Sequence, residues 1–160
     1  MAPMTKADPS IWTDALPYFP RHELECRGTG VIQLDARFAA ALPALRVEWG
    51  RPLTPNSVCR SPQHNASEGG HPRSLHLTDN PAWPTNGTMA ADIRWRGWST
   101  DDQLAFARLA WSRGWSVGLH NGFCHVDRRG DLGLPELPQR VFLYGTWGDD
   151  FSPGDVKAQP

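Results

Sequence analysis

The chain has 160 residues, 39% of them hydrophobic and 21% charged, which is the composition of a folded protein with room for one domain. Sixteen Lys and Arg residues against seventeen Asp and Glu residues leave a net charge of −1, which argues against a protein that binds nucleic acid through its phosphates. Three cysteines exclude a disulfide framework but allow one bridge, and six histidines raise the question of a metal site.

The two ends of the chain predict the domain organisation. We expect a single domain over residues 1–160, with a core at 18–148, a loose N-terminal arm at 1–16 and a mobile polar tail at 149–160. The start lacks a basic segment followed by an apolar run, so no secretory signal is expected. Because no run of about 18 apolar residues occurs, we expect cytoplasmic synthesis and no membrane insertion.

The first predicted helix begins after Asp35, a good N-cap residue, and extends to Trp49. Pro43 lies inside this segment and predicts a kink or a split, because proline removes one helical hydrogen bond. The residues that predict its apolar stripe are Phe38, Leu42, Leu45 and Trp49.

Residues 61–89 are rich in Gly, Pro, Ser, Asn and His and predict a long loop. A loop of this length in a compact domain is usually functional or mobile. Short apolar segments on both sides of it predict strands, which makes the fold class α+β with a small antiparallel sheet and flanking helices. These strands are expected at 53–58, 90–95, 115–120, 123–127 and 140–145.

The second predicted helix begins at Thr100, where Thr100 and Gln103 have the spacing of a capping box. Asp101 and Asp102 suit the positive end of the helix dipole. Gly114 is expected to end the helix.

The strands at 115–120 and 123–127 are separated by Asn121-Gly122, a strong signal for a two-residue hairpin turn. Such a turn fixes the register of the two strands. The expected pairs are His120 with Phe123, Gly118 with His125, and Ser116 with Asp127.

This register places His120, His125 and Asp127 on one face of the hairpin, where they converge. Gly118 stands opposite His125 and is expected to leave space for a metal ion or a substrate. Cys124 points to the other face and is expected in the core. By itself a His-x-Asp sequence on a strand is also compatible with an ordinary surface pair.

Further polar residues precede the hairpin. They are Arg60, His64, His71, Ser74 and His76, followed by Asp92 at the start of a strand. Two imidazoles, one carboxylate and a water are the ligand set of a catalytic zinc site. The composition alone does not select which histidines take part.

The motifs RSPQHNASEGG, SLHLT, AADI and GLHNGFCHVDRRG occur in this order. Together they resemble the zinc D-Ala-D-Ala carboxypeptidase family, which includes the bacteriophage L-alanoyl-D-glutamate endolysins and has the hedgehog-like fold. The upstream segments YFPRHELEC and LDARFAAALPALRVEWGRPL also resemble this family. The resemblance covers about residues 18–130.

The resemblance implies that zinc (Zn2+) is held by His76, Asp92 and His125. Ser74 would support His76 at the substrate-binding site. Arg60 matches the family's arginine, which would bind the substrate carboxylate or stabilise the developing oxyanion in catalysis.

One departure from the family pattern is the long gap between His76 and Asp92, as if DNPAWPTN (79–86) were inserted at the mouth of the site. Trp83 in this segment is expected to contact the substrate, shaping substrate choice or acting as a lid. A tolerated surface insertion is the alternative.

The second departure is Gly122, at a position where many relatives carry a carboxylate that serves as the general base. Asp127 is our candidate for the base or for a group that orients a ligand, with His120 steadying the oxyanion. Glu68 is a reserve base. An ion pair of Asp127 with the neighbouring Arg128 or Arg129 would make it structural instead.

We therefore expect a monomeric zinc peptidase of the endolysin or D,D-carboxypeptidase type. It would hydrolyse peptide bonds of peptidoglycan stem peptides or cross-links with a zinc-activated water. Without a leader it would reach the cell wall after release, as a phage or prophage lysin does. The alternative is a catalytically silent family member that binds the cell wall or a virion component.

Overall fold

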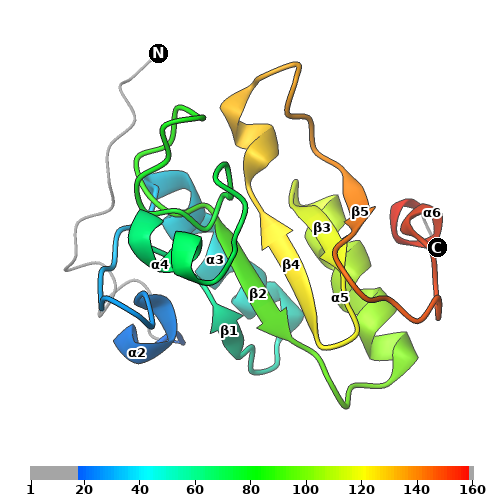
Figure 1. Ribbon diagram of the computed structural model, residues 1–160. Helices are drawn as coiled ribbons and strands as arrows, with labels where there is room; N and C mark the ends of the chain where they lie inside the picture. The colour runs from blue at the N-terminus through cyan, green and yellow to red at the C-terminus, as the bar shows by residue number, and fades with distance from the viewer. Residues whose placement is uncertain (1–17, 159–160) are drawn as a thin grey trace.

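The computed structural model describes residues 18–158, so the predicted arm at 1–16 lies outside the described residues (Figure 1). Five strands and several helices follow one another along this part of the chain. In order they are α2 (Arg21–Leu24), α3 (Ala36–Trp49), β1 (Pro55–Ser57), α4 (Pro62–Ser67), β2 (Ala90–Arg94), α5 (Thr100–Ser112), β3 (Ser116–Leu119), β4 (Phe123–Asp127), a 3₁₀ helix (Arg129–Leu132), β5 (Val141–Leu143) and α6 (Pro153–Lys157).

The strands form one sheet in the order β1-β2-β4-β3-β5, which confirms the α+β class with flanking helices. Every neighbouring pair is antiparallel except β3 and β5, which run parallel. The parallel pairing results from the connection between β4 and β5. β4 ends with Asp127 beside Ser116, at the start of β3, and β5 begins with Val141 beside Val117, at the same end of β3. Because β5 begins where β3 begins, the two strands run in the same direction.

The hairpin of β3 and β4 has the register that the Asn121-Gly122 turn predicts, with Gly118 opposite His125 and Ser116 opposite Asp127. On its other side β4 pairs with β2, which sets Asp92 opposite His125. The sheet therefore brings the two motifs AADI and CHVD together from distant parts of the sequence.

Helix α3 has the predicted bounds, and the Asp35 carboxylate accepts a hydrogen bond from the Arg37 amide as an N-cap. The predicted split at Pro43 does not occur, because α3 is one helix from Ala36 to Trp49. Burial of the Phe38, Leu42 and Leu45 side chains against the sheet offsets the hydrogen bond that the proline removes.

Helix α5 is confirmed, but its N-cap is Ser99 rather than Thr100. The Ser99 hydroxyl accepts a hydrogen bond from the Asp102 amide at 3.1 Å. The chain leaves the helix through Gly114, whose φ of 90° is in the left-handed region that glycine favours.

Residues 151–157 are packed against the domain, whereas the sequence predicts a mobile tail there. Ser152 and Asp155 form a capping box at the start of α6. Phe151 and Val156 are buried, and Phe151 contacts the Trp147 ring with a centroid distance of 4.9 Å. The folded core therefore extends beyond residue 148 to Lys157.

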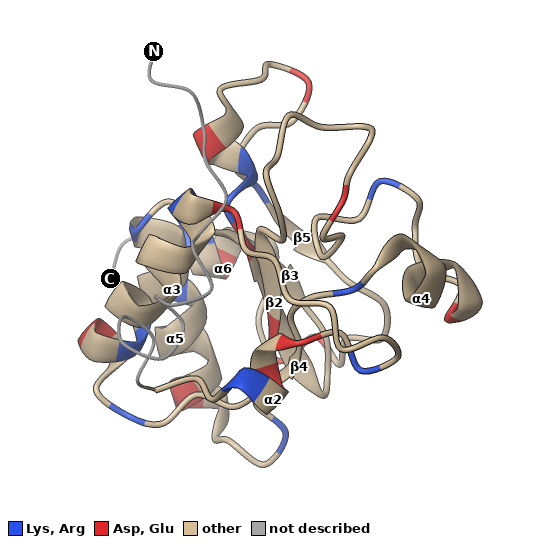
Figure 2. Cartoon of the chain, turned by 90° about the vertical axis from the view of Figure 1, so that its left-hand side faces the viewer, with Lys and Arg blue, Asp and Glu red and all other residues tan. Residues whose placement is uncertain are grey.

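The three cysteines, Cys26, Cys59 and Cys124, are free and buried, so the one disulfide that the sequence allows is not formed. Cys124 lies in the core, as its place on the hairpin predicts. Within residues 18–158 no helix has both the length and the apolar character that crossing a bilayer requires. On the face seen in Figure 2, Lys and Arg residues are interspersed with Asp and Glu.

Candidate metal centre and flanking pockets

His76, Asp92 and His125 lie together, and one nitrogen or oxygen atom from each falls within 4.8 Å of the others. Asp92 and His125 face each other across β2 and β4. His76 comes from the loop before β2, whose backbone is fixed because the Arg60 amide and the Thr88 hydroxyl both donate to the His76 carbonyl. All three side chains are buried.

The His76 ring has its tautomer fixed by the backbone. Its Nδ1 atom lies 2.8 Å from the Val58 carbonyl oxygen, which can only accept, so Nδ1 carries the proton. The Nε2 atom is then free to act as a ligand and lies 3.2 Å from Asp92 Oδ1. Burial lowers the pKa of His76, which favours the neutral, ligating form.

The His125 ring lies between two carboxylates. Nδ1 is 2.9 Å from Asp92 Oδ1, and Nε2 donates to Asp127 Oδ2 at 2.8 Å. Burial acts to lower the pKa of His125, but the hydrogen bonds with Asp127 and Asp92 outweigh it and raise this pKa to about 9. His125 therefore presents Nδ1 to the cluster and is oriented through Nε2.

Asp127 is completely buried, and both of its carboxylate oxygens are engaged. Besides the bond from His125, the Arg129 guanidinium donates to both oxygens at 2.7 to 3.2 Å. Burial acts to raise the pKa of Asp127, but these two partners hold it at about 2. Of the roles expected for Asp127, this placement fits orientation of His125 and an ion pair with Arg129.

The donor set fits a divalent metal ion. Metal-binding histidines usually donate their second ring N–H to a carboxylate or a carbonyl, and His76 and His125 both do so here. Burial acts to raise the pKa of Asp92, but His76 and His125 lower it well below its usual range, so the carboxylate is charged. Two imidazoles and one carboxylate match a catalytic metal site with a remaining open position.

Arg60 and Ser74 lie next to this cluster, as the sequence predicts. Arg60 Nη2 is 4.0 Å from Asp92 Oδ2, and Nη1 donates to the Asn65 side chain at 3.2 Å. The buried Nε atom of Arg60 has no hydrogen-bond partner among the described residues. The Ser74 hydroxyl accepts from the His76 amide at 3.2 Å, which supports the turn that carries this ligand.

Tyr144 is a site residue that the sequence analysis missed. Its ring stacks on the His125 ring with a centroid distance of 4.7 Å and an interplanar angle of 8°. Tyr144 lines the same pocket as Arg60 and Asp92, and burial raises its pKa, with the nearby Arg60 charge acting in the opposite direction. Alternation along 140–145 places Tyr144 on the face of Phe142, but the parallel pairing with β3 that brings this face to His125 has no local sequence signal.

The space beside Gly118 is filled, whereas the sequence predicts it to be open. An added Cβ atom there would lie 3.0 Å from His125, Phe142 and Tyr144 atoms. Gly118 thus allows two aromatic rings of the β5 segment to pack against His125.

His120 does not join the metal cluster. Its ring stacks on Phe123 with a centroid distance of 4.1 Å, and its Nδ1 accepts from the Gly122 amide at 2.9 Å. Within residues 18–158, neither its ring stacking nor its hydrogen bonds involve His76, Asp92 or His125.

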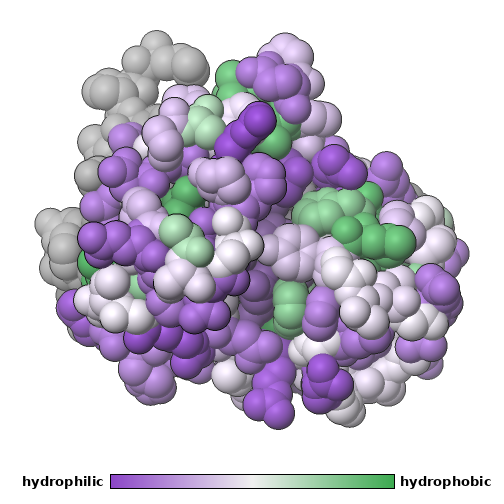
Figure 3. Space-filling model, viewed as in Figure 1, coloured by the Kyte–Doolittle hydropathy of each residue, from purple (hydrophilic) through white to green (hydrophobic). Residues whose placement is uncertain are grey.

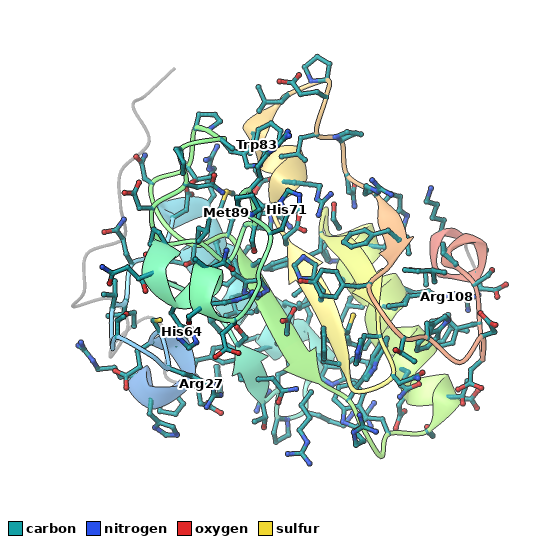
Figure 4. All side chains as sticks on the ribbon, viewed as in Figure 1. Arg27, His64, His71, Trp83, Met89 and Arg108 are labelled. Atoms are coloured by element: carbon teal, nitrogen blue, oxygen red, sulfur yellow. The ribbon has the colours of Figure 1, made fainter. Side chains whose placement is uncertain are left out.

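Two pockets flank the cluster and share Tyr144. The first, of about 530 Å³, includes His125, and the second, of about 460 Å³, includes Asp92 and Arg60. In Figure 4, the labelled His71 and Trp83 lie on the side of the first pocket, and Arg27 and His64 on the side of the second. Trp83, from the insertion, therefore lines the pocket next to a candidate metal ligand.

A buried His–Asp–His cluster between two open pockets is an arrangement typical of metallopeptidases. The family model described as Peptidase M15 matches residues 17–127, so the chain belongs to this family, that of the zinc D-Ala-D-Ala carboxypeptidases. The match confirms the resemblance seen in the motifs. No curated protein and no solved structure matches the chain.

Proposed function

We propose that this protein is a zinc-dependent peptidase that hydrolyses peptide bonds in bacterial peptidoglycan. The observation that carries the proposal is the cluster of His76, Asp92 and His125, buried but bordered by pockets on two sides. A peptide bound across the cluster would place one end in each pocket. Membership in the M15 family supports the peptidase chemistry.

His76 Nε2, an Asp92 oxygen and His125 Nδ1 would hold the ion. When bound, zinc supplies a Lewis acid that polarises a peptide carbonyl and lowers the pKa of water. The chain's own residues keep these ligands in place, since Val58 and Asp127 occupy the outward ring nitrogens of the two histidines.

Arg60 is proposed to bind a substrate carboxylate or the developing oxyanion. Arg60 lines the pocket with Asp92 and Tyr144, and its guanidinium is held by a hydrogen bond to the Asn65 side chain. A guanidinium held in this way stabilises negative charge without reorganising during the reaction.

A group that accepts a proton is also required, and Asp127 has no free oxygen for it. His64 and Glu68 line the pocket that contains Asp92, with His64 Nε2 4.0 Å from Glu68 Oε1. We propose this pair as the source of the general base, with Asp127 orienting His125.

The test combines metal analysis with digestion of purified peptidoglycan. We expect the wild-type protein to bind one zinc ion and to release new muropeptides, detected by mass spectrometry, with loss of activity in a chelator. His76→Ala should lose both properties. The matched control His22→Ala changes an exposed histidine outside the cluster and should retain them. A wild-type protein that binds no zinc and leaves the muropeptide profile unchanged would disprove the proposal.

A second candidate is a binding module without turnover. It is favoured by Gly122, which lacks the carboxylate of many relatives, and by the full engagement of Asp127. Zinc and wall binding by the wild-type protein, with no cleavage of any muropeptide, would identify this function instead.

A further inference from the structure

The pocket of about 530 Å³ beside His125 is lined by three arginines, Arg73, Arg129 and Arg140, and no acidic side chain lines it. It also contains His71 and Trp83. Three guanidinium groups around one pocket create a local positive potential in a protein whose net charge is −1. Such a pocket favours an anionic group.

Two of the three guanidinium groups are available to a ligand. Arg129 is neutralised by Asp127, with an Nη2 to Oδ2 distance of 2.7 Å. Arg73 and Arg140, in contrast, have no side-chain hydrogen bond or ion pair with any residue between 18 and 158. The uncompensated charge of the pocket therefore resides on Arg73 and Arg140.

Arg140 is positioned by an aromatic ring. Its Cζ atom lies 5.2 Å from the centroid of Phe142, and Arg129 Cζ lies 4.9 Å from the same centroid. Cation–π contacts of this kind restrict a guanidinium without using its N–H donors. The donors of Arg140 thus stay free for a ligand.

Arg73 is held by the inserted segment 79–86. The Trp83 indole N–H donates to the Arg73 carbonyl at 3.2 Å, and the buried Asn80 side chain donates to the Ser74 carbonyl at 3.0 Å. The insertion is itself tied to the domain, since the Asn86 amide donates to the Asp35 carboxylate. It is therefore an ordered wall of the pocket, not a loose surface loop.

We propose that this pocket is a specificity site that binds a carboxylate of the peptide substrate through Arg73 and Arg140, on the side of the metal centre opposite Arg60. Carboxylates suit this pair because arginine N–H donors match their two oxygens. This inference rests on the proposed function, and it assigns the insertion a role in substrate choice. It predicts that acidic stem peptides bind better than amidated ones.

Three synthetic peptides separate the carboxylates that could occupy the pocket. The first is acetyl-L-Ala-γ-D-Glu-L-Lys-D-Ala-D-Ala, with a free α-carboxylate on its D-Glu residue and a free C-terminus. The second carries a carboxamide in place of the D-Glu α-carboxylate, and the third has an amidated C-terminus. Each amide is nearly the same size as the carboxylate that it replaces, so differences in binding report charge and hydrogen bonding.

Binding of each peptide to the zinc-loaded, full-length protein is measured by titration calorimetry. We expect the acidic peptide to bind wild-type protein about tenfold more tightly than one of the two amidated peptides. The reason is that losing a hydrogen bond to a charged group weakens binding by about a factor of ten or more. The amidated peptide that binds more weakly shows which carboxylate occupies the pocket. Arg73→Gln combined with Arg140→Gln should abolish the difference.

Arg108→Gln is the matched control, because it removes one positive charge on α5, away from the pocket (Figure 4). It should keep the preference for the acidic peptide. Equal affinities of the wild-type protein for all three peptides would overturn the proposal, and so would a preference that survives the double substitution.

Cleavage of the same peptides, followed by mass spectrometry, separates this inference from the proposed function. Cleavage without any charge preference overturns the pocket's role and leaves the peptidase function intact. A preference that the double substitution abolishes, without cleavage of any peptide or of peptidoglycan, supports the pocket and overturns the peptidase function. A protein that shows no binding preference and cleaves neither the peptides nor peptidoglycan would overturn both proposals.

Discussion

Asp127 Oδ2 lies 2.8 Å from His125 Nε2, on the side of the imidazole that faces away from Asp92. The two residues are separated by one position on β4, so the strand's alternation places both side chains on the same face. The contact gives a candidate metal ligand a fixed ring orientation. It also explains why a completely buried carboxylate is present in this sheet.

Asp127→Asn should weaken zinc binding by about 10- to 100-fold, because the carboxylate that orients a ligating histidine also makes it a stronger donor. Zinc affinity is measured by competition with a chromogenic chelator. Asp150→Asn, an exposed position away from the cluster, should leave the affinity unchanged. An Asp127→Asn protein that folds and binds zinc as tightly as the wild type would contradict the orienting role.

Gly118→Ala should destabilise the protein by about 1–3 kcal/mol, the usual cost of an extra methyl group in a packed site. The new Cβ atom would lie 3.0 Å from atoms of His125, Phe142 and Tyr144, all of which would have to move. Denaturant unfolding measures the change. Gly154→Ala in α6, where an added Cβ atom would lie 3.5 Å from the Ser152 hydroxyl, should show no loss.

Tyr144→Phe should leave zinc affinity unchanged, because the ring that stacks on His125 is retained. Losing the hydroxyl removes a polar group beside Arg60 in the pocket that they share, and a hydrogen bond between such a group and a charged side chain contributes about 1.5–3 kcal/mol. We therefore expect kcat/KM for peptide hydrolysis to fall about tenfold or more. Unchanged kcat/KM would show that the Tyr144 hydroxyl does not position Arg60 for the reaction.

Cys26 predicts a pH-dependent stability. Burial raises the pKa of its thiol, but hydrogen bonds from Ser61, Thr29 and the Gly28 backbone outweigh this effect and lower the pKa from 9.0 to about 6. Between these values the unfolded chain binds the proton and the folded protein does not, so stability increases with pH. The contribution is complete above the unfolded pKa and is lost as the pH falls through about 6.

The measurement compares wild-type protein with Cys26→Ser by urea unfolding under reducing conditions. Their difference in unfolding free energy should grow between about pH 6 and pH 8.5, by at most about 1.4 kcal/mol per pH unit. Because the other titrating groups are common to both proteins, they cancel in this difference. A difference that stays constant over this range would show that the thiol remains protonated.

The parts of the fold that local signals determine could be predicted from the sequence. The Asn121-Gly122 turn fixes the register of its hairpin, and Asp35 starts α3 at the expected residue. The family motifs selected His76, Asp92 and His125 from among the histidines and acids, and these three side chains lie together. The turn and the cap are local signals, whereas the three ligands come from distant segments and were selected by the family resemblance.

The parts that were missed depend on contacts between distant segments. Nothing near Tyr144 indicates that β5 runs parallel to β3, yet this pairing brings its ring to His125. Phe151 likewise contacts the ring of Trp95, more than fifty residues earlier in the chain, at a centroid distance of 6.3 Å, although its own segment is polar in composition. The choice of Ser99 over Thr100 as N-cap is a shift of one residue, within the usual uncertainty of helix ends.

The β5 segment lies beyond residue 127, where the family match ends. Arg140, Phe142 and Tyr144 therefore belong to a separate stretch of sequence from the three candidate metal ligands. Leu143, on the same strand, is 56% exposed, and Figure 3 shows an apolar patch over β5. The proposed specificity pocket thus combines Arg73 and Trp83, from within the matched region, with Arg140 and Phe142, from the stretch that follows it. Exchanging residues 128–148 between family members would therefore alter one side of this pocket and leave the three candidate metal ligands unchanged.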